Sequence, residues 1–331
     1  MQDIRSSDPK ALVRALFAPI AEDMAAVDAI IRKELDSDVP RMREIGEHIV
    51  SAGGKRMRPA LLMLICRALG YEGELHRYLG ATIELLHTAT LMHDDVVDES
   101  AVRRGKPTAN ALWGNGVAVL VGDFLYTRSF QMMIRAGNLR VMRALADAAN
   151  TLAEGEVKQM VNAHDPTVDE KRYFEVIERK TACLFEAGAK MAAAIADCSE
   201  KDEAAVREYA LALGNAFQIV DDMLDYTGVS NDIGKNLGAD LREGKVTLPL
   251  LYARLHTSEE NRALIDAAIR SGNGDFDKIS SIVIESQAIA RCKQRAEQEL
   301  ERGKVALLQL SPSIFRDSLI QLLFYTVCRD R

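Results

Sequence analysis

Apolar residues recur every three or four positions along almost the whole chain, and this spacing is typical of amphipathic α-helices. Sustained alternation of apolar and polar residues, which would indicate strands, does not occur. The pattern predicts helices at residues 11–35, 40–50, 60–70, 75–98, 117–136, 139–163, 170–197 and 202–227, and several more from residue 247 onward. We therefore expect an all-α fold.

Proline, glycine and polar residues mark the expected ends of these helices. Pro19 should break or kink the first helix, and Pro40 should open the second. Residues 105–116 are expected to form a loop or broken turn, and residues 229–245 a long polar loop. Because the chain has neither a short repeat nor a low-complexity linker, we expect one domain spanning residues 1–331.

Composition narrows the class of protein. Of the 331 residues 48% are hydrophobic, which suffices for a large core, and the net charge of −7 disfavours general binding to nucleic acid. Five scattered cysteines without a C-x-x-C spacing fit a reduced, cytoplasmic compartment. The N-terminus has no apolar signal region, and no uncharged apolar run reaches the ~18 residues of a membrane span.

Two helical segments end in clusters of aspartates, DDVVD at residues 94–98 and DDMLD at residues 221–225. Asp94 and Asp98 are four residues apart and therefore share one helix face, with Asp95 roughly 100° round the helix. The second cluster repeats this arrangement with Asp221, Asp222 and Asp225. A single cluster can be a solvated helix end, whereas two matching clusters after apolar runs indicate a shared cation.

The chemistry of these clusters suits Mg²⁺, which takes oxygen ligands and binds one or two protein carboxylates together with substrate phosphates. Basic residues lie around both clusters and could bind the same phosphates: Lys55, Arg58, Arg103, Arg104, Lys180, Lys235 and Lys245. Each of these taken alone fits an ordinary surface charge. Together with the aspartates they predict a site for a metal-bridged diphosphate.

Several motifs occur in the order found in trans-prenyl diphosphate synthases: GGKRMRP, DDVVD followed by RR, KTA, GNAFQIVDDMLDY and GKNLGADLREGKVTLPLL. They cover about residues 40–255 and resemble this family, particularly its bacterial members that make octaprenyl diphosphate for quinone side chains. The resemblance implies an isoprenoid-synthase helical bundle around a central apolar tunnel. It also implies elongation of an allylic diphosphate, with farnesyl diphosphate as starter, by isopentenyl diphosphate to a product of about C40.

The resemblance assigns roles residue by residue. Three Mg²⁺ ions would be held by Asp94, Asp98 and Asp221, with Asp95, Asp222 and Asp225 in support. Arg103, Lys180 and Lys245 would clamp the allylic diphosphate, with Lys235 close by. Isopentenyl diphosphate would be held by Gly54, Lys55, Arg58, His87 and Arg104, while Thr181 and Gln218 would face the reacting carbons. For His93 a structural hydrogen bond is favoured over a catalytic role.

Product length is expected to depend on residues one helical turn or more before Asp94, because one turn of ~5.4 Å matches one isoprene unit. Short-chain members of the family carry an aromatic residue there, whereas this chain has Ala89 and Thr90. Met132 or Met133 could form the floor of the tunnel, although either residue also fits ordinary core packing.

Two other functions share some of these features. A terpene cyclase usually replaces the second aspartate cluster, and a regulatory subunit usually loses one cluster or the basic turn. This chain keeps both aspartate clusters and the basic turn GGKRMRP. The family is also expected to form a homodimer and to make transient contact with a membrane surface when product is released. A prenyl diphosphate synthase of shorter or longer product remains an alternative.

Overall fold

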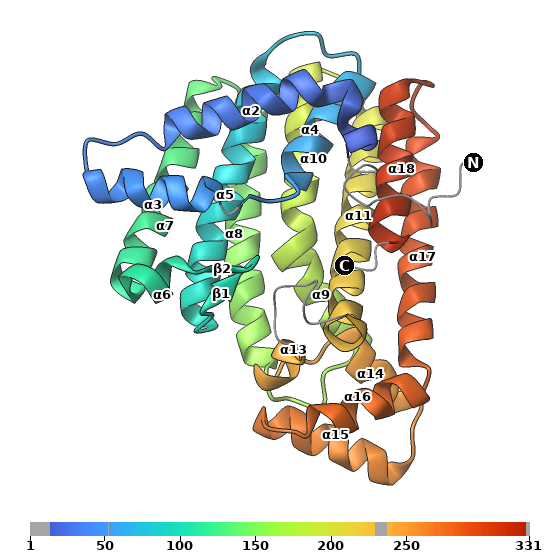
Figure 1. Ribbon diagram of the computed structural model, residues 1–331. Helices are drawn as coiled ribbons and strands as arrows, with labels where there is room; N and C mark the ends of the chain where they lie inside the picture. The colour runs from blue at the N-terminus through green and yellow to red at the C-terminus, as the bar shows by residue number, and fades with distance from the viewer. Residues whose placement is uncertain (1–13, 52, 229–236, 329–331) are drawn as a thin grey trace. The chain divides into compact units, whose positions relative to one another are not determined.

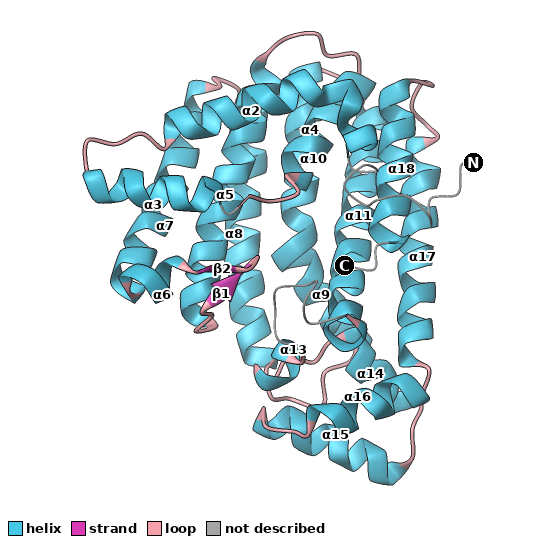
Figure 2. Cartoon of the chain, viewed as in Figure 1, coloured by secondary structure: helices cyan, strands magenta, loops and turns pink. Residues whose placement is uncertain are grey.

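The computed structural model describes residues 14–51, 53–228 and 237–328, and nearly all of its regular structure is helical (Figures 1 and 2). The only strands among these residues are β1 (Val102–Arg103) and β2 (Lys106–Pro107), which form an antiparallel hairpin. The prediction of an all-α fold is confirmed. Within the described part of the chain, no helix combines the length and the apolar character needed to cross a bilayer.

The chain folds into two compact units, which are described separately. Unit 1 comprises residues 1–148, 184–207 and 306–321, and unit 2 comprises residues 149–183, 208–305 and 322–331. The prediction of a single domain is not tested by this division.

Unit 1 is built around α5, a long helix that packs against α2, α4 and α7. Its early elements are η2 (Ala18–Ile20), α2 (Ala21–Glu34), α3 (Pro40–Ser51), α4 (Met57–Ala68), α5 (Leu75–Val97), α6 (Ala109–Trp113) and α7 (Asn115–Arg135). Gly80 allows close packing in this core, because a Cβ atom there would lie 2.7 Å from Met63 Cε. Buried Asp23 of α2 forms ion pairs with Arg67 of α4 and Arg77 of α5, which ties the three helices together.

Unit 2 contains the second aspartate cluster, at residues 221–225, together with helical elements that lie wholly within this unit. They include α9 (Glu170–Ile177), η3 (Glu178–Ala182), α13 (Ala239–Arg242), α14 (Leu248–Leu255), α15 (Glu259–Ser271) and α16 (Phe276–Glu285). Five of the described helices have residues in both units: α8 (Leu139–Asn162), α10 (Cys183–Ala196), α11 (Glu200–Thr227), α17 (Ala288–Leu307) and α18 (Ile314–Cys328).

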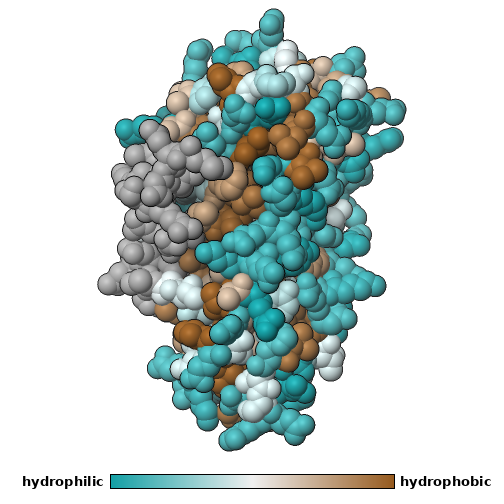
Figure 3. Space-filling model, turned by 90° about the vertical axis from the view of Figure 1, so that its right-hand side faces the viewer, coloured by the Kyte–Doolittle hydropathy of each residue, from teal (hydrophilic) through white to brown (hydrophobic). Residues whose placement is uncertain are grey.

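Most helix ends agree with the sequence pattern. Pro19 lies in the 3-10 turn between two helical segments, and Pro40 is the first residue of α3. Helix α4 begins at Met57, three residues earlier than expected. Pro59 is tolerated in its first turn, because backbone N–H groups there have no acceptor within the helix. Figure 3 shows one face of the molecule, which is largely hydrophilic with scattered hydrophobic patches.

Three segments differ from the prediction. The expected loop at 105–116 contains the second strand of the hairpin and the short helix α6, whose first turn is capped by the Thr108 side chain. The helix expected at 170–197 contains a π-helical turn, η3, between α9 and α10. Of the expected loop at 229–245, residues 229–236 lie outside the described part and residues 239–242 form α13.

Candidate active site

The first aspartate cluster occupies the C-terminal end of α5. Asp94 and Asp95 lie in its last turn, Asp98 is the C-cap residue, and the last turn has no basic residue. The C-terminus of a helix carries a partial negative charge, so three carboxylates here are unfavourable without a cation. This end of α5 is therefore suited to bind one.

Asp95 differs from its two neighbours because it is buried and already paired. Its Oδ1 accepts a hydrogen bond from Arg103 Nε on β1 at 2.7 Å. Burial raises the pKa of Asp95, and the Arg103 charge opposes this rise. Asn110 donates to the backbone oxygens of Asp95 and Ser100, at 3.1 Å each, and so fixes the turn that follows α5. Asp95 thus orients Arg103.

The basic turn before α4 packs against the second of the two adjacent arginines. The Arg104 guanidinium donates a hydrogen bond to the Gly53 carbonyl oxygen. A Cβ atom on Gly54 would lie 2.5 Å from Arg104 Nη1, so only glycine leaves room for the guanidinium in this position. Gly53 and Arg56 have positive φ angles of 65° and 47°, which fold the turn back toward the hairpin.

Four arginines surround His87 on α5. Burial and the positive charges of Arg58, Arg104, Arg103 and Arg56 together hold the pKa of the His87 imidazole well below its usual value. The imidazole is therefore neutral and leaves the excess of positive charge to the arginines. Such a cluster attracts anions, and phosphate in particular.

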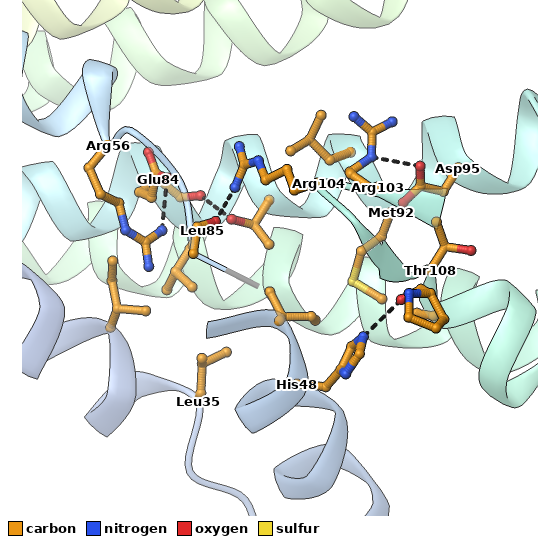
Figure 4. Close-up of a pocket in the computed structure, with 17 residues that line it drawn as sticks. Leu35, His48, Arg56, Glu84, Leu85, Met92, Asp95, Arg103, Arg104 and Thr108 are labelled. Carbon is orange, nitrogen blue, oxygen red and sulfur yellow. Dashed lines mark hydrogen bonds and ion pairs between the residues drawn. The ribbon is translucent and has the colours of Figure 1, made fainter. Parts of the chain in front are cut away.

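A pocket opens beside these arginines, and Figure 4 shows how its charged wall is built. Arg56 points to Glu84, whose Oε1 accepts a hydrogen bond at 2.8 Å, while His48 Nε2 lies 3.0 Å from the Pro107 oxygen. Leu35 and Leu85 line the apolar side. Sequence reasoning missed Arg56 and Glu84, although Arg56 lies within the motif GGKRMRP.

Other predicted residues of unit 1 lie in well-packed surroundings. Arg58 stacks over the Phe185 ring at 4.7 Å from the ring centroid. Ala89 and Met132 are fully buried, Met133 is nearly so, and Thr90 donates its hydroxyl hydrogen to the His87 oxygen. The expected hydrogen bond of His93 is present, with Nε2 3.3 Å from the Val119 oxygen.

The second aspartate cluster lies near the C-terminal end of α11 in unit 2, again without a basic residue in the last turn. Asp221 is exposed, Asp222 is buried and Asp225 is half-buried. Asp225 accepts hydrogen bonds from the backbone N–H groups of residues 238–240 at the start of α13, at 3.0 to 3.3 Å. Burial raises the pKa of Asp225 to about 7, with a further contribution from the charge of Asp240.

The π turn η3 carries Lys180 and Thr181. Lys180 Nζ donates to Glu156 Oε2 on α8 at 2.6 Å, and Thr181 Oγ1 donates to Gln218 Oε1 on α11 at 2.8 Å. Gly155 permits this packing, because a Cβ atom there would lie 2.8 Å from the backbone nitrogen of Lys180. π turns inside α-helices frequently occur at functional sites.

The structure brings predicted residues together within each unit. In unit 1 the first cluster and the arginines surround one region of α5, and in unit 2 the second cluster lies beside the π turn. Lys245 pairs with Glu243, and Lys235 lies outside the described residues. Since the clusters belong to different units, their facing each other stays a prediction.

The donors fit a hard divalent cation, because both clusters offer carboxylate oxygens. Over residues 14–51, 53–228 and 237–328, no group of three or more His, Cys, Asp or Glu side chains is arranged to hold a metal by itself. Mg²⁺ ordinarily takes one or two protein carboxylates and completes its shell with water and substrate phosphate oxygens.

Comparison with known proteins identifies the class. Residues 39–285 match the family model described as polyprenyl synthetase, and the chain belongs to this family. It is 47% identical over 313 residues to the octaprenyl diphosphate synthase of Escherichia coli (strain K12), covering 94% of this chain and 97% of that protein. It is 44% identical to an all-trans-nonaprenyl-diphosphate synthase (geranyl-diphosphate specific) of Rhodobacter capsulatus, covering 93% and 95%.

Solved structures give the same result. The polyprenyl synthase of Caulobacter crescentus CB15, complexed with calcium and isoprenyl diphosphate, superposes with a TM-score of 0.92 at 37% identity and covers 99% of this chain and 100% of its own. A decaprenyl diphosphate synthase from Rhodobacter capsulatus has a TM-score of 0.91 at 44% identity, covering 96% and 99%. The fold is thus that of the all-helical isoprenoid synthases.

Proposed function

We propose that this chain is a long-chain trans-polyprenyl diphosphate synthase that condenses isopentenyl diphosphate repeatedly onto an allylic diphosphate, with farnesyl diphosphate as starter. Its product would be about C40 and would serve as a quinone side chain. The observation that carries the proposal is the pair of acidic helix ends, accompanied in unit 1 by four arginines around a neutral histidine. The octaprenyl and nonaprenyl relatives support a long product.

Mg²⁺, three ions when substrate is bound, would be held by Asp94, Asp98 and Asp221, and would neutralise charge on the departing diphosphate. The side chains of Asp95, Asp222 and Asp225 would lie next to these ligands and help to hold them in position. Asp95 does so while binding Arg103. The calcium and isoprenyl diphosphate bound to the Caulobacter relative support a divalent metal here.

The basic residues would divide the two substrates between them. Arg103, Lys180 and Lys245 would clamp the allylic diphosphate, with Lys235 nearby. The Lys180 ammonium has three N–H donors, so it can keep its bond to Glu156 while it donates to phosphate. Glu156 would therefore hold Lys180 in place.

Isopentenyl diphosphate would lie against Gly54, Lys55, Arg58, His87 and Arg104. The Arg104 guanidinium is already fixed by Gly53, so it loses little conformational freedom on binding. Neutral His87 can donate one hydrogen bond without adding a charge.

The reaction itself requires no protein nucleophile. Loss of diphosphate would leave an allylic cation, which the double bond of isopentenyl diphosphate attacks, and the released diphosphate would take the proton. Thr181 and Gln218 would face the reacting carbons, and apolar walls would exclude water that would quench the cation. Ala89 and Thr90 would leave room for the growing chain, and Met132 or Met133 would end the tunnel.

Several further properties are part of the proposal. The family match runs through segments of both units, which supports a single functional domain over residues 1–331. We also propose a cytoplasmic location; the five scattered cysteines, all within the described residues, form no disulfide. Exposed Val119, Leu120 and Ile134 on α7 support burial of that helix in a homodimer. We also include transient contact with a membrane surface during product release.

The purified chain should be incubated with radiolabelled isopentenyl diphosphate, farnesyl diphosphate and Mg²⁺, and the extracted product analysed for chain length. A labelled product near C40 supports the proposal. A cyclic hydrocarbon made without labelled isopentenyl diphosphate would indicate a terpene cyclase. Absence of product until a second subunit is added would indicate a regulatory subunit.

A further inference from the structure

A tyrosine that sequence reasoning did not select contacts the second aspartate cluster. Tyr173 lies on α9 with 4% of its surface exposed, and its hydroxyl donates to Asp222 Oδ2 at 2.7 Å. Asp222 is equally buried. A buried carboxylate that receives a hydrogen bond from a buried phenol is fixed in one orientation.

The other oxygen of Asp222 is also occupied. Gln218, one turn earlier on α11, donates its amide hydrogen to Asp222 Oδ1 at 2.8 Å. The Gln218 oxygen in turn accepts the hydroxyl of Thr181 at 2.8 Å. Hydrogen bonds therefore connect four side chains in a line, in the order Thr181, Gln218, Asp222 and Tyr173.

Each hydrogen bond of this network has a defined donor. Tyr173 and Gln218 each donate to one of the two carboxyl oxygens of Asp222. The Gln218 side-chain oxygen accepts the Thr181 hydroxyl. This arrangement ties the α11 residue next to exposed Asp221 to the π turn that carries Lys180.

The start of α9 directs Tyr173 toward α11. The Asp169 side chain caps the helix by accepting the N–H of Arg172 at 2.8 Å, and Tyr173 follows in the first turn. The Tyr173 and Phe174 rings meet edge to face with 5.4 Å between their centroids. The ring of Tyr173 is therefore held by packing as well as by its hydroxyl.

We propose that Tyr173 is a positioning residue that holds Asp222, and with it the end of α11, in the orientation in which the second aspartate cluster binds metal and diphosphate. This inference rests on the proposed function and adds a residue to it. Groups that orient the carboxylates of a metal site typically change metal affinity by about 10- to 100-fold when removed. Tyr173 does not itself touch metal or substrate in this proposal.

Calorimetric titration of the full chain with Mg²⁺ in the presence of inorganic pyrophosphate tests the proposal without relying on turnover. Tyr173→Phe should weaken Mg²⁺-dependent pyrophosphate binding by about 10-fold or more, while the melting temperature changes little. Tyr209→Phe is the matched control, because it removes the same atom from a buried tyrosine of α11. It should leave binding unchanged.

The pair with Asp222 distinguishes positioning from general packing. If Tyr173 acts through Asp222, the double variant Tyr173→Phe with Asp222→Asn should bind no more weakly than Asp222→Asn alone. Wild-type binding in Tyr173→Phe, or a lower melting temperature with unchanged binding, would overturn the proposal. Fully additive losses in the double variant would overturn it as well.

A second variant covers the case in which Tyr173→Phe does not fold. Thr181→Val breaks the chain at its far end and keeps the shape of the side chain, whereas Thr181→Ser keeps the hydroxyl. Thr181→Val should bind Mg²⁺ and pyrophosphate more weakly than Thr181→Ser, and equal binding contradicts the network. Failure of the proposed function would appear separately, as wild-type protein that binds pyrophosphate but makes no prenyl product.

Discussion

Replacing Gly54 by alanine should damage the isopentenyl diphosphate site without destabilising the fold. The new Cβ atom would lie 2.5 Å from Arg104 Nη1 and 3.1 Å from its Cζ. Carbon atoms pack at about 3.5 Å or more, so the guanidinium must move by roughly 1 Å. The clash involves the end of a flexible side chain, and Gly54 has no positive φ, so the backbone need not change.

The magnitude follows from the interaction that is lost. A hydrogen bond to a charged group contributes about 1.5–3 kcal/mol, and about 1.4 kcal/mol corresponds to a factor of ten in binding. Displacing Arg104 should therefore raise the KM for isopentenyl diphosphate by about 10- to 100-fold. The KM for the allylic diphosphate should change much less, because Arg104 is not assigned to that substrate.

Two other glycines provide controls for the steady-state assay and for thermal denaturation. Gly53→Ala meets no atom within 4 Å but forces alanine to adopt a φ of 65°, which costs about 1–2 kcal/mol of stability. Gly116→Ala meets no atom and requires no positive φ, so it should change neither stability nor KM. A wild-type KM for isopentenyl diphosphate in Gly54→Ala would refute the assignment of Arg104.

Three further predictions test other parts of the structure. Ala89→Tyr should shorten the product to about two to four isoprene units by chromatography, because one helical turn matches one unit; an unchanged length would reject the tunnel assignment. Asp94→Ala or Asp221→Ala should nearly abolish turnover, and a variant with the wild-type rate removes that residue from the proposed metal ligands. Asp23→Asn should lower the free energy of unfolding at neutral pH by about 1–3 kcal/mol, because it removes the buried charge that pairs with half-buried Arg67 and Arg77. Burial alone would raise the pKa of Asp23, but hydrogen bonds from its two arginines outweigh burial and lower it. The stabilisation by Asp23 is therefore present above about pH 4 and is lost as the pH falls further. Denaturant unfolding of the wild type and the variant at pH 3 and pH 7 measures both effects.

The helices could be predicted because their periodicity is a local property of the sequence. The spacing of Asp94, Asp95 and Asp98 fixes their relative directions once α5 is a helix, and α5 was expected within a residue of its observed ends. The hairpin at 102–107 was missed because strands of two residues are too short to show alternation. The π turn was missed because it changes the hydrogen-bond register of a helix without changing its composition.

Contacts between distant segments account for the site residues that sequence reasoning missed. Tyr173 and Asp222 are 49 positions apart, and Arg56 and Glu84 are 28 apart, so no local pattern joins either pair. Arg56 could have been selected from its place in the basic turn, whereas Tyr173 carries no signal in a single sequence. Periodicity therefore locates the charged groups, and only the folded chain identifies the residues that orient them.

The two aspartate clusters share a physical property that links stability to function. Each lies at a helix C-terminus that lacks a compensating basic residue, and each includes one carboxylate buried against a specific donor. The buried member, Asp95 or Asp222, is fixed by Arg103 or Tyr173, while its sequence neighbours Asp94 and Asp221 are more exposed. Repulsion at such ends falls when a cation binds, so a ligand that binds only the folded chain should also stabilise it. The same carboxylates that make these ends unfavourable without metal are therefore the ones we assign to metal and diphosphate.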